Sequence, residues 1–198
     1  IDALGPVIAA RRPPGRWSRT RRAEARTRTT LEDLLGGLDG VERPAEAATF
    51  LAAGIQVPIA AGAFLLAHLA AHPTGRVDPL GAVWETLRLT PPTWITARIT
   101  VVDTDLAGTR VPAGSVVLVS PLLLGRSEDL VPGDPDRLDG FDPGRWHDPT
   151  RRPGAWLPFG AGPHACPGRT LGIALLTELA RWGVERDMSL SEPVRIDQ

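Results

Sequence analysis

The chain has 198 residues, enough for one domain with a sizeable hydrophobic core. Its 22 basic and 23 acidic side chains nearly cancel, which argues against the strongly basic balance of a nucleic-acid-binding domain. The single cysteine excludes a disulfide within the chain, and the start shows no recognisable signal peptide. We therefore expect a cytoplasmic protein without a nucleic-acid partner.

The first 44 residues differ in composition from the rest. Residues 11–28 hold eight arginines and one glutamate, Glu24. Such a run is typical of a solvated helix face or loose arm, and a patch for an acidic partner is the alternative. A short polar helix is expected over 30–38. We predict an Arg-rich arm with a short helix over 1–44 and one larger portion over 45–198.

A long apolar segment follows over 45–71, with no charged residue between Glu46 and Arg76. Its length would suit a membrane span. However, Ala and Gly dominate it, and Gln56, Pro58 and His68 interrupt it. We therefore expect a helix buried on all sides within a protein, and no membrane partner.

The next predicted helix begins at Asp78, a favourable N-cap, with Pro79 in its first turn, and it ends before Pro91. Glu85 and Arg88 lie three residues apart and are therefore neighbours on this helix. An isolated pair of this kind is most often an ion pair at the surface that contributes little to stability.

Two segments without helical periodicity come next. Residues 93–120 alternate and turn as short antiparallel strands do. Residues 127–150 are rich in Pro, Asp and Gly, and a long irregular loop in a compact domain needs a functional or tethering reason. The predicted fold is therefore mainly α-helical with a small antiparallel β-sheet.

The stretch over 156–172, WLPFGAGPHACPGRTLG, holds the only cysteine, Cys166. Its glycines and prolines fix a tight loop whose backbone can approach a flat, large group. An amphipathic helix is predicted over 169–182, with leucines 171, 175, 176 and 179 on its apolar stripe. The N-terminus of this helix favours a thiolate at Cys166. The alternative is a buried structural cysteine.

The spacing Phe159-x-x-Gly162-x-His164-x-Cys166-x-Gly168 resembles the haem-binding signature of the cytochrome P-450 superfamily. This resemblance implies the C-terminal part of that fold, with Cys166 as the axial ligand of the iron of haem b. Phe159 would shield the sulfur, and Gly168 would let helix and macrocycle approach closely. Because the whole family domain is about twice this long, we expect a fragment, an excised domain or a shortened relative.

The resemblance extends to the apolar helix, where the family carries a small-Gly-x-acid-Thr pattern. Ala53 and Gly54 match this pattern, but Gln56 and Val57 stand where the family has the acid and the alcohol that deliver protons during oxygen activation. Gln56 has no proton to give at neutral pH, and Val57 has no donor. Haem ligation does not depend on this pair.

Three further family roles can be carried over. In the family the Glu85-x-x-Arg88 pair is buried and joined by an arginine at the position of Arg145, which would lock the cysteine loop. Arg98 and His164 occupy positions where the family contacts the haem propionates. The alternatives are a strand arginine that faces water and a polar loop residue.

Two functions of different class remain open. The first is a haem-thiolate oxidoreductase that monooxygenates a small organic substrate, with electrons from a donor such as a ferredoxin or a reductase. The second is a catalytically degenerate homologue that acts as a structural or activating partner of another enzyme. The complete cysteine loop favours the first, whereas Gln56 and Val57 favour the second.

Overall fold

The structure of the chain, a computed structural model, describes residues 42–72, 77–131, 138–147, 156–186 and 188–191. The chain divides into two compact units, Ile1–Gln56 and Val57–Gln198. The predicted Arg-rich arm and the short helix over 30–38 lie outside the described residues. The boundary predicted between residues 44 and 45 stays a prediction.

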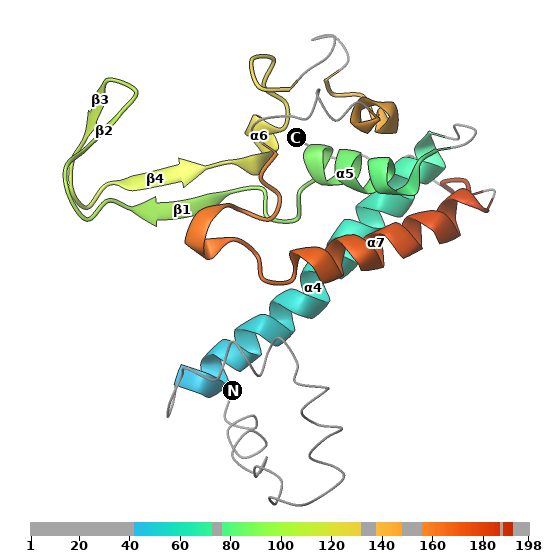
Figure 1. The fold of residues 1–198 in the computed structure, drawn as a ribbon, viewed down its shortest axis with the longest axis horizontal. Helices are drawn as coiled ribbons and strands as arrows, with labels where there is room; N and C mark the ends of the chain where they lie inside the picture. The colour runs from blue at the N-terminus through green and yellow to red at the C-terminus, as the bar shows by residue number, and fades with distance from the viewer. Residues whose placement is uncertain (1–41, 73–76, 132–137, 148–155, 187, 192–198) are drawn as a thin grey trace, which may run out of the picture. The chain divides into compact units, whose positions relative to one another are not determined.

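Helices make up most of the described elements (Figure 1). The α-helices are α4 (Glu42–Ala71), α5 (Pro79–Leu89), α6 (Pro121–Leu124) and α7 (Arg169–Val184), and the 3-10 helices include η2 (Pro143–Trp146) and η4 (Gly162–His164). Helix α5 begins as the sequence predicts: the Gly81 N–H donates to the Asp78 carboxylate over 2.7 Å, with Pro79 in the first turn.

The strands form two antiparallel pairs in place of one small sheet. β1 (Thr96–Ile99) pairs with β4 (Val116–Val119), and β2 (Thr104–Leu106) pairs with β3 (Thr109–Val111). The loop between β2 and β3 consists of Ala107 and Gly108, with φ of 52° and 82°, as a two-residue hairpin with matching twist requires. The expected mainly helical fold with small antiparallel β-structure is confirmed.

One hydrophobic core joins three helices of the second unit. It consists of Ala61, Leu65 and Leu69 of α4, Ala82, Val83 and Leu87 of α5, and Leu176 and Ala180 of α7. Gly62 of α4 lies close to α7, since a Cβ there would be 2.9 Å from Leu179 Cδ2 and would require that side chain to move. Helices α5 and α7 are therefore fixed against each other and against the end of α4.

The buried face of α7 agrees with the predicted stripe at Leu176, which is buried, and at Leu179, which packs against the core, but not at Leu171 and Leu175. Leu176, Ala180 and Gly183 are buried, at helical spacing, whereas Leu171 is 66% and Leu175 52% exposed. The reason is that α4 and α5 cover only the side of α7 that carries Leu176, Ala180 and Gly183. Leu171 and Leu175 lie toward the start of the helix and remain open.

The prediction that this apolar helix, α4, is buried on all sides is also wrong. Residues Ala45–Ala71 are long and apolar enough to cross a membrane by length and composition, which is weak evidence for a span. In the part that belongs to the second unit, Leu65 is 1% exposed but Ile59 is 67% exposed. Helices α5 and α7 cover one face of this part, and the opposite face is open.

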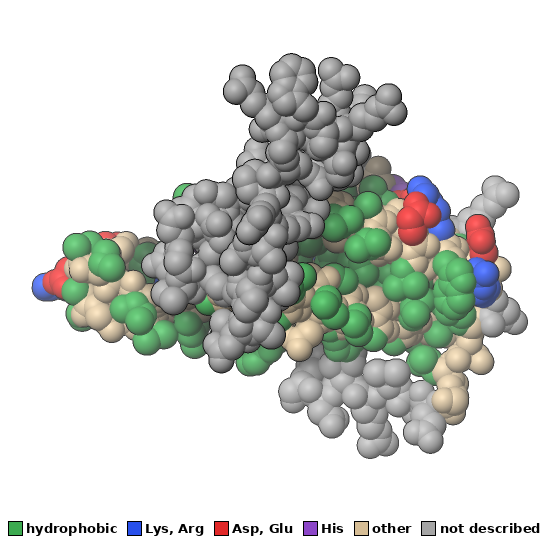
Figure 2. All heavy atoms as spheres, turned by 90° about the horizontal axis from the view of Figure 1, so that it is seen from below, with side chains coloured by type: hydrophobic (Ala, Val, Ile, Leu, Met, Phe, Trp, Pro, Cys, Tyr) green, Lys and Arg blue, Asp and Glu red, His purple; other side chains and the backbone are tan. Residues whose placement is uncertain are grey.

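The β1–β4 pair also exposes an apolar face. Ile99 lies opposite Val116 and Ala97 opposite Leu118, so alternation places these four side chains on one side. Ile99, Val116 and Leu118 are between 61% and 69% exposed. Figure 2 shows hydrophobic side chains at the surface of this strand region, at the left of the view. The strand region is thus far less covered than the helical core.

Candidate functional site

A buried carboxylate lies at the centre of the packed region. Glu85 of α5 is fully buried, and its two oxygens accept hydrogen bonds from five donors. Arg88 supplies two of them, from Nε over 2.9 Å and from Nη2 over 2.7 Å. Removing a carboxylate from water is costly unless its oxygens are paired, and this pairing satisfies both of them.

The other three donors come from the segment 138–147. The Asp142 N–H donates over 3.1 Å and Arg145 Nε over 3.4 Å, both to Glu85 Oε1. Trp146 Nε1 donates to Oε2 over 2.9 Å. The structure therefore brings Glu85, Arg88 and Arg145 together, and the Arg145 side chain is 5% exposed. Sequence reasoning missed Asp142 and Trp146 as partners of this carboxylate.

Arg88 extends the cluster to two more segments. Its Nη1 donates to the Gly125 carbonyl over 2.7 Å, and its Nη2 to the Gly140 carbonyl over 3.3 Å. Gly125 must be glycine here, since a Cβ would lie 2.6 Å from the Arg88 carbonyl oxygen. One ion cluster thus fastens the end of α6 and the segment 138–147 to α5.

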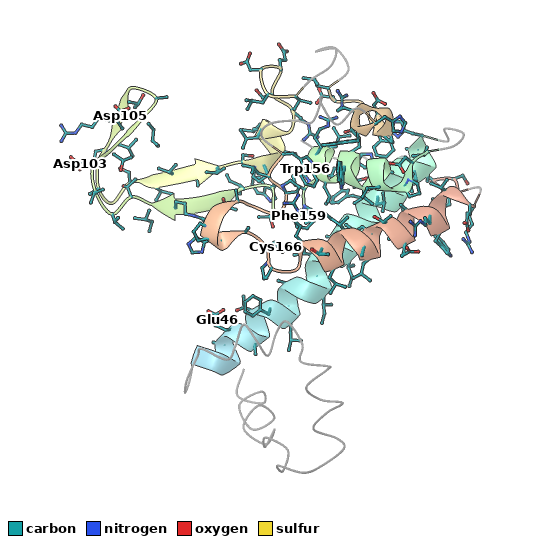
Figure 3. The ribbon with its side chains drawn as sticks, in the orientation of Figure 1. Glu46, Asp103, Asp105, Trp156, Phe159 and Cys166 are labelled. Carbon is teal, nitrogen blue, oxygen red and sulfur yellow. The ribbon has the colours of Figure 1, made fainter. Side chains whose placement is uncertain are left out.

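Aromatic rings continue from this cluster toward the cysteine. Trp146 packs edge-on against Trp84 and Trp156, with ring centroids 5.2 and 5.7 Å apart. Trp156 Nε1 donates to the Trp84 carbonyl over 3.2 Å, and its ring lies 6.0 Å from that of Phe159. In Figure 3, Trp156, Phe159 and Cys166 follow one another from the α5 side to the start of α7.

The cysteine loop itself is held by backbone hydrogen bonds. The Cys166 N–H donates to the Phe159 carbonyl over 2.8 Å, and the Ala165 N–H donates to the Gly162 carbonyl over 3.1 Å. Gly160 and Gly162 have φ of 64° and 68°, a conformation that side chains disfavour. The turn that brings the Cys166 N–H to the Phe159 carbonyl therefore requires glycine at both positions.

Cys166 is exposed, and so is every residue from 160 to 171. This exposure argues against a thiol packed among aliphatic neighbours, which was the alternative reading. A Cβ at Gly168 would lie 3.8 Å from the Cys166 sulfur, and one at Gly172 would lie 3.6 Å from the Phe159 ring. The sulfur therefore lies at the open start of α7, beside positions without side chains.

The two predicted propionate contacts lie on different elements. Arg98 is exposed on β1, where its Nη1 donates to the neighbouring Ala97 carbonyl over 2.8 Å. His164 is exposed at the end of η4, two residues before Cys166. Their roles toward a cofactor stay predictions.

The four residues compared with the small-Gly-x-acid-Thr pattern lie on α4. Ala53, Gly54, Gln56 and Val57 are all exposed, and a Cβ at Gly54 would meet nothing within 4 Å. Gln56 ends the first compact unit and Val57 begins the second. The substitution of the acid and the alcohol is a fact of the sequence, and its consequence for proton delivery stays a prediction.

A histidine beside the ion cluster has an unusual environment. Burial lowers the pKa of His68 from 6.5 to about 4, and the nearby His72 lowers it further, whereas the Glu85 carboxylate opposes the shift. Its ring stacks on Phe141, with centroids 4.8 Å apart and planes 4° apart. His68 is therefore neutral in the folded chain at neutral pH.

Comparison with known proteins identifies the family. A cytochrome P-450 family model matches residues 81–179, half of the chain, and this stretch contains both the Glu85 cluster and the cysteine loop. The chain belongs to the cytochrome P-450 family.

Three curated relatives carry the names of oxygenases or synthases. Over 178 residues the chain is 34% identical to cyclooctat-9-en-7-ol 5-monooxygenase of Streptomyces melanosporofaciens, with 74% of this chain and 38% of that protein covered. It is 42% identical to cyclooctatin synthase of the same species, with 50% and 22% covered. Pentalenene oxygenase of Streptomyces avermitilis is 36% identical, with 52% and 24% covered. The chain thus spans well under half the length of these relatives.

Membership of this family implies haem as cofactor, and the residues present fit it. The Cys166 sulfur is accessible, the residues around it leave space at Gly168 and Gly172, and the loop is fixed at its Phe159 end. A thiolate at the start of a helix is a suitable ligand for iron. The fit therefore rests on the Cys166 sulfur as iron ligand and on the open space beside it at Gly168 and Gly172.

We predict that Glu85→Gln destabilises the second unit strongly. The change leaves the buried Arg88 without its counter-charge, which costs about 3–5 kcal/mol of unfolding free energy. The matched control is Asp103→Asn, which neutralises an acid paired with Arg110 at the surface and should leave the urea midpoint unchanged. Equal effects of the two substitutions on urea unfolding would contradict this account of the cluster.

A second prediction concerns pH. Because the folded pKa of His68 lies below its ordinary value, the unfolded chain takes up the proton first as the pH falls. The contribution of neutral His68 to the free energy of unfolding is complete above about pH 6.5. It is lost as the pH falls toward 4, which lowers this free energy by about 2–3 kcal/mol. His68→Gln should remove that part of the pH dependence of urea unfolding. An identical pH dependence in wild type and variant would show that another group is responsible.

Proposed function

We propose that this chain is the haem-binding portion of a haem-thiolate monooxygenase, with the Cys166 thiolate as the axial ligand of haem b. The observation that supports this most directly is the exposed Cys166 at the start of α7, in a loop that Trp156 fastens to α5 and that Phe159 holds by accepting the Cys166 N–H. The family membership and the names of the relatives support the same reaction class.

The chain's own residues would bind and orient the cofactor. When bound, haem supplies the oxidation by dioxygen, and thiolate ligation favours O–O cleavage. Gly168 and Gly172 would allow the macrocycle to approach α7 closely, and Phe159 would keep water from the sulfur. Arg98 and His164 would donate hydrogen bonds to the propionates, Arg98 through its two parallel N–H groups.

The proposed substrate is a small organic molecule, and electrons would come from a donor such as a ferredoxin or a reductase. The names of two relatives refer to cyclooctat-9-en-7-ol and to pentalenene. These names favour an apolar substrate with a cyclic hydrocarbon skeleton. As the chain spans 38% of the first of these proteins, substrate binding belongs to the proposal for the whole protein.

A second candidate function is favoured by one observation. Gln56 and Val57 replace the acid and the alcohol that deliver protons in the family. A homologue without this pair could retain haem or the fold alone and serve as a structural or activating partner of another enzyme. The two candidates differ in whether reducing equivalents are used for product formation.

Cys166 can be tested by spectroscopy. The purified chain supplied with haem, reduced and exposed to carbon monoxide, should give the red-shifted absorption band of thiolate-ligated iron. Cys166→Ser, which keeps the size of the side chain but removes the soft ligand, should abolish this band. A wild-type spectrum indistinguishable from that of free haem would contradict the proposed ligand.

The proton-delivery prediction needs turnover. In a full-length protein that carries this sequence, oxidation driven by reduced nicotinamide cofactor should be poorly coupled to product, because Gln56 and Val57 cannot relay protons. Gln56→Glu combined with Val57→Thr should raise the product formed per reducing equivalent. Efficient coupling in the unmodified protein would show that protons travel by another route and would remove the support for the second candidate.

A further inference from the structure

Trp146 is the residue at which the ion cluster and the aromatic group meet. Its side chain is 7% exposed as part of the core, and its indole N–H donates to Glu85 Oε2 over 2.9 Å. A buried indole N–H normally requires such a partner. The hydrogen bond fixes the ring of Trp146 relative to α5.

The ring of Trp146 then contacts the residue that begins the cysteine loop. Its edge-on contact with Trp156 has a centroid distance of 5.7 Å and an interplanar angle of 67°. Trp156 is held on its other sides by the Trp84 carbonyl, by the Phe159 ring and by the Arg169 guanidinium, which lies 5.8 Å from the ring centre. Edge-on pairs of this kind have a preferred geometry.

The remaining step to the sulfur is a backbone contact. Phe159 is packed against the core, and its carbonyl accepts the Cys166 N–H over 2.8 Å. Residues 160–171 are exposed. The position of Cys166 is therefore set by the anchored end of the loop, at Trp156 and Phe159, and by the start of α7.

We propose that Trp146 is a positioning residue for Cys166, acting through Trp156 and Phe159. This inference rests on the proposed function, because a fixed sulfur matters only if it binds iron. From the sequence, the role of holding the cysteine loop was assigned only to the charged residues Glu85, Arg88 and Arg145. The geometry adds a neutral donor, the Trp146 indole N–H, that connects the carboxylate to Trp156 at the start of the loop.

Hydrogen exchange of the full 198-residue chain without haem tests this coupling. Trp146→Phe keeps an aromatic ring but removes the N–H donor. We expect the Cys166 amide to exchange at least tenfold faster in this variant, with a much smaller change in the core amides of α5 and α7. Trp94→Phe is the matched control, since Trp94 is 58% exposed, and it should change neither.

Trp156→Phe provides a second variant, which removes the bond to the Trp84 carbonyl and should give the same local pattern. An unchanged Cys166 amide in both variants would overturn the inference. Faster exchange by one common factor throughout the core would also overturn it, because that is the signature of a purely structural role.

A failure of the positioning role can be distinguished from a failure of the proposed function. If wild type with haem gives the thiolate band while the exchange of Cys166 is insensitive to Trp146 and Trp156, the function stands and the positioning role falls. If the exchange pattern is as expected, the haem-loaded Trp146→Phe variant should show a smaller thiolate band than Trp94→Phe at equal haem content. Equal bands would contradict the role toward the ligand.

Discussion

The buried carboxylate of Glu85 is the constraint on which the described fold depends. A charge inside a protein is tolerated only when hydrogen bonds and counter-charges replace its water. Here the donors come from α5 and from the segment 138–147, and Arg88 adds the carbonyls of Gly125 and Gly140. The carboxylate is satisfied only when these segments are assembled, so it favours one arrangement of chain regions without regular secondary structure.

This arrangement places a group of mutually packed aromatic rings between the ion cluster and the start of α7. Trp84, Trp146 and Trp156 contact one another, and Phe159 continues the contact to the loop. The cysteine loop thus has a fixed end inside the core and an exposed part that carries the sulfur. A ligand to a large cofactor needs both properties, because the sulfur must be accessible and its position must be defined.

The sequence predicted those features that depend on local spacing. The cap at Asp78, the pairing of Glu85 with Arg88 and the place of Cys166 before a helix follow from neighbouring residues. The contact of Trp146 with Glu85 joins residues 61 positions apart and depends on how the segment 138–147 folds back. The face of α7 that is buried, and the partial burial of α4, likewise depend on which helices cover them, and periodicity alone does not contain that information.

Family membership and the site together favour a cysteine that binds haem iron, and the chain spans a minor part of the length of its curated relatives. The measurement that tests this claim most directly is X-ray absorption at the iron edge of the haem-loaded chain, compared with Cys166→Ser. A sulfur neighbour of the iron in the wild-type chain, absent in the variant, is the predicted result. An iron surrounded only by nitrogen and oxygen in both proteins would contradict the account.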